Sequence, residues 1–348
     1  MSIKICVLFA GMLLVPGLMH AAPNDTIRIG DHSALQAERF YNEGIRLFNQ
    51  NRLEDALKAF DKAVETYPEY AQAYYNRGVV KQSQFNFPAA LADFEKALEI
   101  NPEHTLAHLA RGYALSETGQ PEKAMKSFDQ AIKIAPDHYL GWYLRGVALF
   151  WLGEYGRAVQ DFSRAIELKP DYAPAWNDRG SARQMAGNTS GAMADFQQAM
   201  LLDPSMHFTF NNMGNLRNEM QQYNEAMEYF TTAIRLNPNY AMAYNNRGIA
   251  RFNMEQFAEA VSDYNRAIEL NPVFSQAYNN RGNARYKLND YQGALADFSK
   301  AIELNPGYGE AYLNRGIVQE MLRDLDSARN DWQKALELGV SIAESYLK

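Results

Sequence analysis

One 34-residue segment recurs without insertion from residue 37 to residue 342, and this fixed period constrains the fold more than any other feature of the sequence. The copy from Ser275 to Tyr308 shows the pattern well. A strict period of this length is typical of chains in which one small structural unit stacks on its neighbours. The sequence therefore predicts nine units, at 37–70, 71–104, 105–138, 139–172, 173–206, 207–240, 241–274, 275–308 and 309–342.

Five positions within the unit hardly vary. The eighth residue is glycine, the twentieth and twenty-seventh are alanine and the twenty-fourth is aromatic in every unit, and proline stands at position 32 in the first eight. In the ninth unit Val340 replaces that proline. The glycines are Gly44, Gly78, Gly112, Gly146, Gly180, Gly214, Gly248, Gly282 and Gly316, and the aromatic residues are Phe60, Phe94, Phe128, Phe162, Phe196, Phe230, Tyr264, Phe298 and Trp332.

This spacing predicts two helices packed face to face in each unit. Glycine at position 8 lets a second helix approach the first closely, and positions 20, 24 and 27 form the matching stripe on that second helix. Proline at position 32 ends the second helix. Because one helical hairpin cannot bury both of its faces, each unit has to stack on the next.

The pattern resembles the tetratricopeptide repeat, whose signature is a large residue at 4, Gly at 8, Ala at 20, an aromatic at 24, Ala at 27 and Pro at 32. The resemblance covers residues 37–342. It implies an all-α fold, a right-handed superhelical solenoid in which the first helices line a concave groove that binds peptides or proteins. Residues 343–348 are expected to add a short capping helix. The fold is a scaffold and implies no chemistry by itself.

The N-terminus has the features of a secretory signal peptide. Lys4 precedes an apolar run from Ile5 to Met19, and the small residues Ala21 and Ala22 follow. The run is shorter than the ~20 residues that span a bilayer, which favours a cleaved signal at 1–22 over a retained anchor. Residues 23–36 are predicted to form a flexible lead-in. The protein is therefore expected to be exported, to a periplasm or the medium.

The charge of the mature chain disfavours two classes of partner. Loss of residues 1–22 removes one lysine from 34 basic residues, which leaves 33 against 41 acidic residues, or about −8. An acidic chain does not favour nucleic acid or an anionic membrane surface. The single cysteine, Cys6, leaves with the signal, so the mature chain has no thiol chemistry.

Positions 2, 5, 9, 12 and 13 of the first helix lie opposite the core stripe, and in units 3 and 4 they are large and apolar. This composition predicts the centre of a partner interface on an exposed surface. Packing of some of these side chains against neighbouring helices is the alternative. The residues are Leu106, Leu109, Tyr113, Leu140, Tyr143, Val147, Phe150 and Trp151.

In units 5 to 8 the same face carries asparagine at position 5, and further asparagines stand at positions 6 and 9. Rows of amides offer both donors and acceptors, so they can hold the backbone of an extended peptide. The rows are similar to the asparagine ladder of O-linked N-acetylglucosamine transferases. Hydrogen bonding between neighbouring repeats is the alternative. The predicted contacts are Asn177, Asn211, Asn212, Asn215, Asn245, Asn246, Asn279, Asn280 and Asn283.

Arginine at position 7 occurs together with an acid at position 23 in six units. Units 1 and 6 lack both residues, and this joint presence and absence predicts a bidentate ion pair within the hairpin. The pairs are Arg77 with Asp93, Arg145 with Asp161, Arg179 with Asp195, Arg247 with Asp263, Arg281 with Asp297, and Arg315 with Asp331.

No catalytic arrangement is recognisable in the sequence. There is no glycine-rich phosphate loop with lysine, no Gly-x-Ser-x-Gly and no His-Glu-x-x-His. We therefore expect no enzyme activity, no cofactor and no metal, and a protein or peptide as the partner. A self-assembling component, possible as a homo-oligomer, and an adaptor that docks a catalytic partner are the alternatives.

Overall fold

The protein is described by a computed structural model covering residues 32–348, and in this range it is entirely helical, without strands. Contacts between helices divide the described chain into two compact units. Their boundary in the sequence falls within α10 (Thr189–Leu202). The N-terminal unit is defined here as residues 32–195 and the C-terminal unit as residues 196–348.

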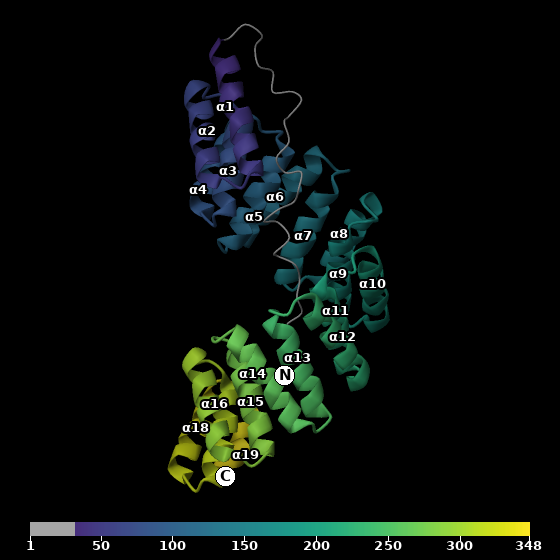
Figure 1. The fold of residues 1–348 in the computed structure, drawn as a ribbon, viewed down its shortest axis with the longest axis vertical. Coiled ribbons are helices and arrows are strands. Elements are labelled where there is room, and N and C mark those ends of the chain that lie inside the picture. Colours follow the sequence, from purple (N-terminus) through teal and green to yellow (C-terminus); the bar gives the residue numbers. More distant parts are fainter. Residues whose placement is uncertain (1–31) are drawn as a thin grey trace. The chain divides into compact units, whose positions relative to one another are not determined.

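The N-terminal unit is a series of helical hairpins (Figure 1). Each helix packs on the next one along the chain, and the first helices of adjacent hairpins also touch. Its helices are α1 (His32–Asn49), α2 (Leu53–Thr66), α3 (Ala71–Ser83), α4 (Phe87–Ile100), α5 (Thr105–Glu117), α6 (Pro121–Ile134), α7 (Tyr139–Trp151), α8 (Tyr155–Leu168) and α9 (Ala173–Met185).

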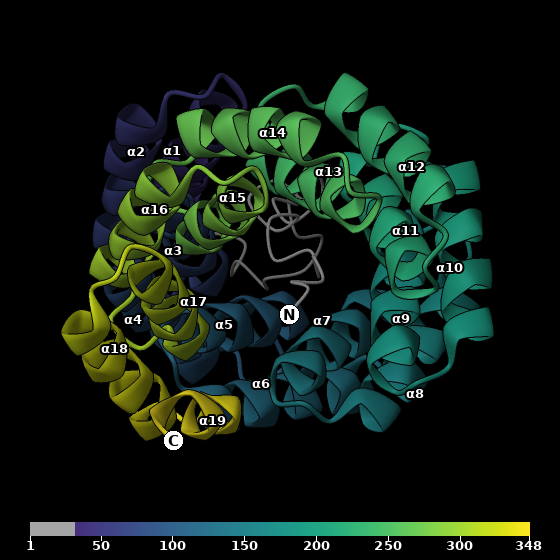
Figure 2. The same ribbon diagram turned by 90° about the horizontal axis from the view of Figure 1, so that it is seen from below.

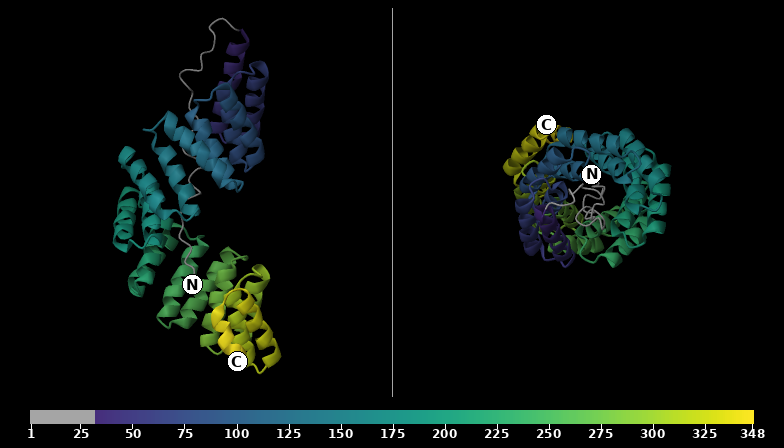
Figure 3. Two further views of the ribbon diagram at one scale, coloured as in Figure 1. Left: turned by 180° about the vertical axis from the view of Figure 1, so that it is seen from behind. Right: turned by 90° about the horizontal axis from the view of Figure 1, so that it is seen from above.

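The C-terminal unit repeats the arrangement. Figure 2 shows α13, α15 and α17 side by side in an inner layer, with α14, α16 and α18 outside them, and the views in Figure 3 show the same sequence of hairpins. The helices are α11 (His207–Glu219), α12 (Tyr223–Leu236), α13 (Ala241–Asn253), α14 (Phe257–Leu270), α15 (Ser275–Lys287), α16 (Tyr291–Leu304), α17 (Gly309–Met321), α18 (Leu325–Glu337), the 3₁₀ turn η2 (Ser341–Ala343) and α19 (Glu344–Leu347).

The two ends of the repeat array are also helical. Helix α1 begins at His32, so the prediction of a flexible segment is wrong for residues 32–36. Ala34 is buried one turn before Ala37 and extends the apolar stripe of the helix, which the polar composition of the segment concealed. The predicted signal at 1–22 and residues 23–31 lie outside the described residues. At the other end, Tyr346 of α19 covers the ring of Trp332.

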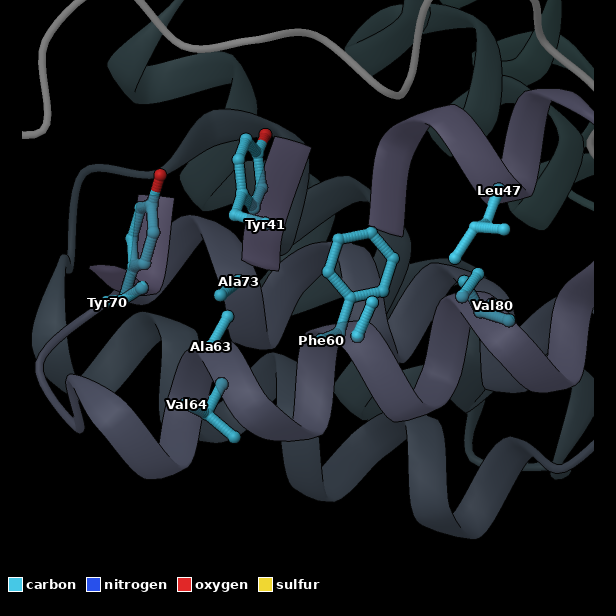
Figure 4. Close-up of a cluster of buried hydrophobic side chains, with 11 residues drawn as sticks. Tyr41, Leu47, Phe60, Ala63, Val64, Tyr70, Ala73 and Val80 are labelled. Atoms are coloured by element: carbon cyan, nitrogen blue, oxygen red, sulfur yellow. The ribbon is translucent and has the colours of Figure 1, made fainter. Parts of the chain in front are cut away.

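A glycine–aromatic contact sets the distance between the two helices of each hairpin. A methyl carbon on the glycine at position 8 would lie 2.5–2.8 Å from the ring at position 24, closer than real carbon atoms approach. Only the absence of a side chain lets the helices pack this closely. Figure 4 shows the first core, where Phe60 lies with Tyr41, Tyr70 and Val80. The contact occurs at Gly44, Gly78, Gly112, Gly146, Gly214, Gly248, Gly282 and Gly316.

The arginine at position 7 joins each hairpin to the one before it. Its Nε and Nη2 donate to the two carboxylate oxygens of the acid at position 23, over 2.6–3.0 Å in all six pairs, which confirms the predicted bidentate geometry. Its Nη1 donates over 2.6–3.2 Å to position 25 of the preceding hairpin: Asp61, Asp129, Ser163, Thr231, Asn265 or Ser299. One side chain therefore ties three helices together.

Helix α5 carries the exception to this pairing. Arg111 has a serine at position 23, and its Nε donates to Ser127 Oγ over 3.0 Å. Burial lowers the pKa of Arg111, whereas the pKa of Arg145 is raised, chiefly by the hydrogen bonds that Arg145 donates to Asp161. The acid at position 23 is therefore what compensates the desolvation of this arginine row.

Two glycine substitutions in one hairpin test the close contact. Gly146→Ala places a methyl group 2.8 Å from the ring of Phe162 and should lower the free energy of unfolding by about 1–3 kcal/mol. Gly156→Ala in α8 meets nothing within 4 Å and should leave stability unchanged or raise it by about 0.5 kcal/mol. Guanidinium unfolding followed by circular dichroism measures both, and equal midpoints would contradict the role given to Gly146.

Candidate functional site

The apolar cluster predicted as an exposed interface is mostly buried. Leu109, Leu140, Tyr143, Val147 and Phe150 are in the core, Leu106 and Tyr113 are half-buried, and of the eight only Trp151 is exposed, with 58% of its surface accessible. The prediction of a water-exposed patch was therefore wrong for five of these residues. Contact of these eight residues with a partner stays a prediction.

Tyr143 shows why the helix-periodicity argument failed at position 5. Its hydroxyl donates to Asp178 Oδ2 of the next repeat over 2.8 Å, and its ring meets that of Tyr172 edge-on at 5.1 Å. Burial, and next the charge of Asp178, raise the pKa of Tyr143 well above its usual value. Position 5 thus lies between the first helices of adjacent hairpins, and a large side chain there packs against the neighbour.

The asparagines of the C-terminal unit form a hydrogen-bonded ladder between repeats. Each position-6 amide donates through Nδ2 to the Oδ1 of position 5 in the preceding repeat, over 3.0 Å. The interpretation that the rows bond between repeats is therefore confirmed. The bonds run from Asn246 to Asn211, from Asn280 to Asn245 and from Asn314 to Asn279.

The remaining predicted amides lie near the start of the asparagine rows. Asn177, Asn211, Asn212 and Asn215 are all buried, and Asn177 Nδ2 donates to Asp178 Oδ1 over 2.8 Å. A buried amide that bonds inside the protein stabilises the packing of the helices. This burial sets these four apart from the half-buried Asn283.

The ladder fixes the polarity of the amides that it uses. Asn279 has one side-chain hydrogen bond, accepted by Oδ1, so its Nδ2 remains as a donor. Asn280 has one, donated by Nδ2, so its Oδ1 remains as an acceptor. In the eighth repeat, Asn279 Nδ2 and Asn280 Oδ1 therefore remain as one donor and one acceptor on adjacent residues, the pair of groups that a peptide unit needs. In the seventh repeat, Asn245 Nδ2 instead donates to Asn246 Oδ1 over 3.2 Å.

These amides line a hollow of about 460 Å³ on the first helices of the last three hairpins. The hollow lies wholly within the C-terminal unit, on α13, α15 and α17, the inner layer of Figure 2. Five of the predicted site residues lie here: Asn245, Asn246, Asn279, Asn280 and Asn283. The other lining residues are Met242, Ile249, Phe274, Gln276, Tyr308, Glu310, Leu313 and Asn314.

Apolar side chains surround the amides. Phe274 and Tyr308 hold the last position of their repeats, just before the next first helix begins. Burial, and next the negative charge of Glu310, raise the pKa of Tyr308 to about 12, so this phenol is neutral at physiological pH. The site therefore combines amide groups, aromatic edges and a single carboxylate.

Our sequence prediction missed the walls of this hollow although a signal was present. Position 34 is aromatic at Tyr70, Tyr172, Tyr240, Phe274 and Tyr308. Position 2 was assigned to the ligand face but was used only in units 3 and 4. Met242, Gln276 and Glu310 occupy it in units 7 to 9 and line the hollow.

Models of repeat families match several segments of the repeat array. Models described as tetratricopeptide repeat match 71–104, 139–172, 241–274 and 275–308, then 105–138 and 298–330. A model described as TPR repeat matches 44–84 and 214–255. The chain belongs to the tetratricopeptide-repeat family. Members of this family are generally non-catalytic scaffolds for protein–protein interaction.

Solved structures share the fold of this tetratricopeptide-repeat chain at low sequence identity. The Cut9–Hcn1 hetero-tetramer of APC/C is similar over 90% of this chain and 76% of its own, with 16% identity and a TM-score of 0.62. PilW, a type IV pilus biogenesis factor, is similar over 59% of this chain and 94% of its own, with 18% identity and a TM-score of 0.55. PilF of Pseudomonas aeruginosa is similar over 58% and 91%, with 19% identity and a TM-score of 0.53. No curated protein matches the chain by sequence.

Two kinds of feature are absent from the described residues. Within residues 32–348, no helix combines the length and the apolar composition that crossing a membrane requires. In the same range, no three histidine, cysteine or acidic side chains come together as metal ligands.

Two asparagine substitutions distinguish a residue of the ladder from a residue that lines the hollow without taking part in the ladder. Asn280→Ala removes the donor to Asn245 Oδ1, which lies in the interior, and should lower the free energy of unfolding by about 1–3 kcal/mol. Asn283→Ala removes a half-buried amide with no hydrogen bond to a described residue and should change it by less than about 0.5 kcal/mol. Denaturant unfolding compares the two, and a larger loss for Asn283→Ala would contradict the ladder.

Proposed function

We propose that this protein is a non-enzymatic scaffold that binds an extended segment of a partner protein in the hollow on α13, α15 and α17. The observation that carries the proposal is the adjacent pair Asn279 Nδ2 and Asn280 Oδ1, which the ladder leaves as an unused donor and an unused acceptor in a hollow of about 460 Å³. Buried polar groups normally find partners, so these amides favour a ligand that supplies N–H and C=O groups.

The arrangement suits an extended backbone better than a folded surface. The hollow crosses the first helices of three consecutive hairpins, and the unused donor of Asn279 and acceptor of Asn280 lie on the central one, α15. An extended chain presents donors and acceptors at regular intervals along its length, and its side chains alternate between two sides. Met242, Ile249 and Leu313 supply apolar surface for side chains that point into the hollow.

A substitution that fills the hollow without disturbing the ladder tests this function. Asn283→Arg adds a long cation at a position that makes no hydrogen bond to a described residue, whereas Asn239→Arg makes the same change on the exposed turn before α13. Proteins bound to the immobilised wild type should be bound equally by Asn239→Arg and at least about tenfold less by Asn283→Arg. Quantitative mass spectrometry of the bound fractions measures this, and equal binding by all three would place the partner elsewhere.

We also propose that the protein works outside the cytoplasm, in a periplasm or the medium. The support is the succession of Lys4, the apolar run Ile5–Met19 and the pair Ala21–Ala22. N-terminal sequencing of the protein from its native cells should find Pro23 or a neighbouring residue first. A protein that begins at Met1 or Ser2 would retain the segment and would contradict cleavage.

A further inference from the structure

Glu310 is the only ionisable group other than the phenol of Tyr308 among the residues that line the hollow. It lies at the second position of α17, is exposed, and has no cationic partner in the described part of the chain. A carboxylate without a cationic neighbour is available to pair with a cation of a ligand.

The position-7 arginines of these hairpins form ion pairs and hydrogen bonds outside the hollow. Arg247, Arg281 and Arg315 donate to the acids of their own hairpins and to the preceding hairpin. Neither lysine nor arginine lines the hollow. The electrostatic potential at the α17 end of the hollow is therefore set by Glu310, and it is negative.

The walls next to Glu310 suit the stem of a long side chain. Tyr308 lies close enough for the charge of Glu310 to raise its pKa, and Leu313 is on the same helix one turn further on. An aromatic ring and an aliphatic side chain beside a carboxylate can hold the methylenes and the charged head of one lysine or arginine.

The buried amides provide a second, independent indication of a ligand. Asn279 is 5% exposed and Asn280 is 7% exposed, yet each retains one unused polar group, and both line the hollow. We propose that the hollow takes an extended segment that carries a basic side chain at its α17 end, where Glu310 pairs with it. This inference rests on the proposed function and adds the charge of the ligand to it.

The same geometry disfavours an acidic ligand. Positions 2 and 5 of α17 are Glu310 and Leu313, so this end of the hollow offers no cation to an acidic ligand. A carboxylate at this end would meet another carboxylate with no cation between them. An acidic segment is therefore the occupant that the test should exclude.

The probe is a random library of acetylated, amidated hexapeptides, selected on three immobilised proteins. These are the wild type, Glu310→Gln, and Glu303→Gln, which makes the same charge change at an exposed residue of α16 outside the hollow. The wild type and Glu303→Gln should enrich peptides with lysine or arginine at one fixed position. Glu310→Gln should still enrich peptides but without that preference.

The affinity for one selected peptide then measures the interaction between Glu310 and the basic residue of the peptide. Fluorescence anisotropy should show about threefold to fivefold weaker binding when Glu310 becomes Gln or when the peptide's lysine becomes norleucine, and little further loss when both change. The difference should shrink at high salt, because the pair is exposed.

The outcomes separate this inference from the function on which it rests. Enriched peptides without a basic residue, with an acidic one, or with a basic preference that survives Glu310→Gln would overturn the cation site and leave peptide binding intact. Asn283→Arg is selected in parallel as a fourth protein. If no peptide is enriched on the wild type relative to Asn283→Arg, both the cation site and the proposed peptide binding are overturned.

Discussion

The close contact between the position-8 glycine and the position-24 aromatic ring underlies the rest of the structure. It brings the two helices of a hairpin to a distance that any side chain on the glycine would prevent. The arginine at position 7 can then donate to the acid at position 23 through both Nε and Nη2, because the two helices are held at a constant separation. Every further interaction between hairpins depends on this shared geometry, which explains why the period never changes.

Stacking of hairpins uses polar groups as well as apolar ones. Arginine Nη1 crosses to the preceding hairpin, and the asparagine ladder joins the first helices on the opposite side. The ladder uses one polar atom each of Asn279 and Asn280 and leaves the other, whereas Asn245 and Asn246 also bond to each other. In the N-terminal unit the same positions hold residues such as Tyr143 and Leu109, which pack without leaving polar groups for a ligand. The two units therefore share a fold but present different chemistry on their first helices.

This difference locates the candidate site. The hollow on α13, α15 and α17 combines unused amide groups with apolar walls and one carboxylate, and it needs no residue outside the three hairpins that form it. Trp151 remains the one exposed aromatic residue of the cluster predicted in units 3 and 4. The unused amide groups of Asn279 and Asn280 line the hollow, which therefore carries the stronger chemical argument.

The sequence by itself determined the hairpins, their register and the pairing of Arg281 with Asp297, because these contacts lie within one unit at a fixed separation of 16 residues. It also indicated which asparagines face the neighbouring repeat, although it left two interpretations of them. Only the tertiary structure decided which side chains remain accessible to a ligand. Tyr143 and Asn279 both stand at position 5, where the neighbouring first helix covers them, and Gln276 and Glu310 at position 2 line the hollow. That outcome depends on how closely adjacent first helices approach, which no periodicity within a single helix can reveal.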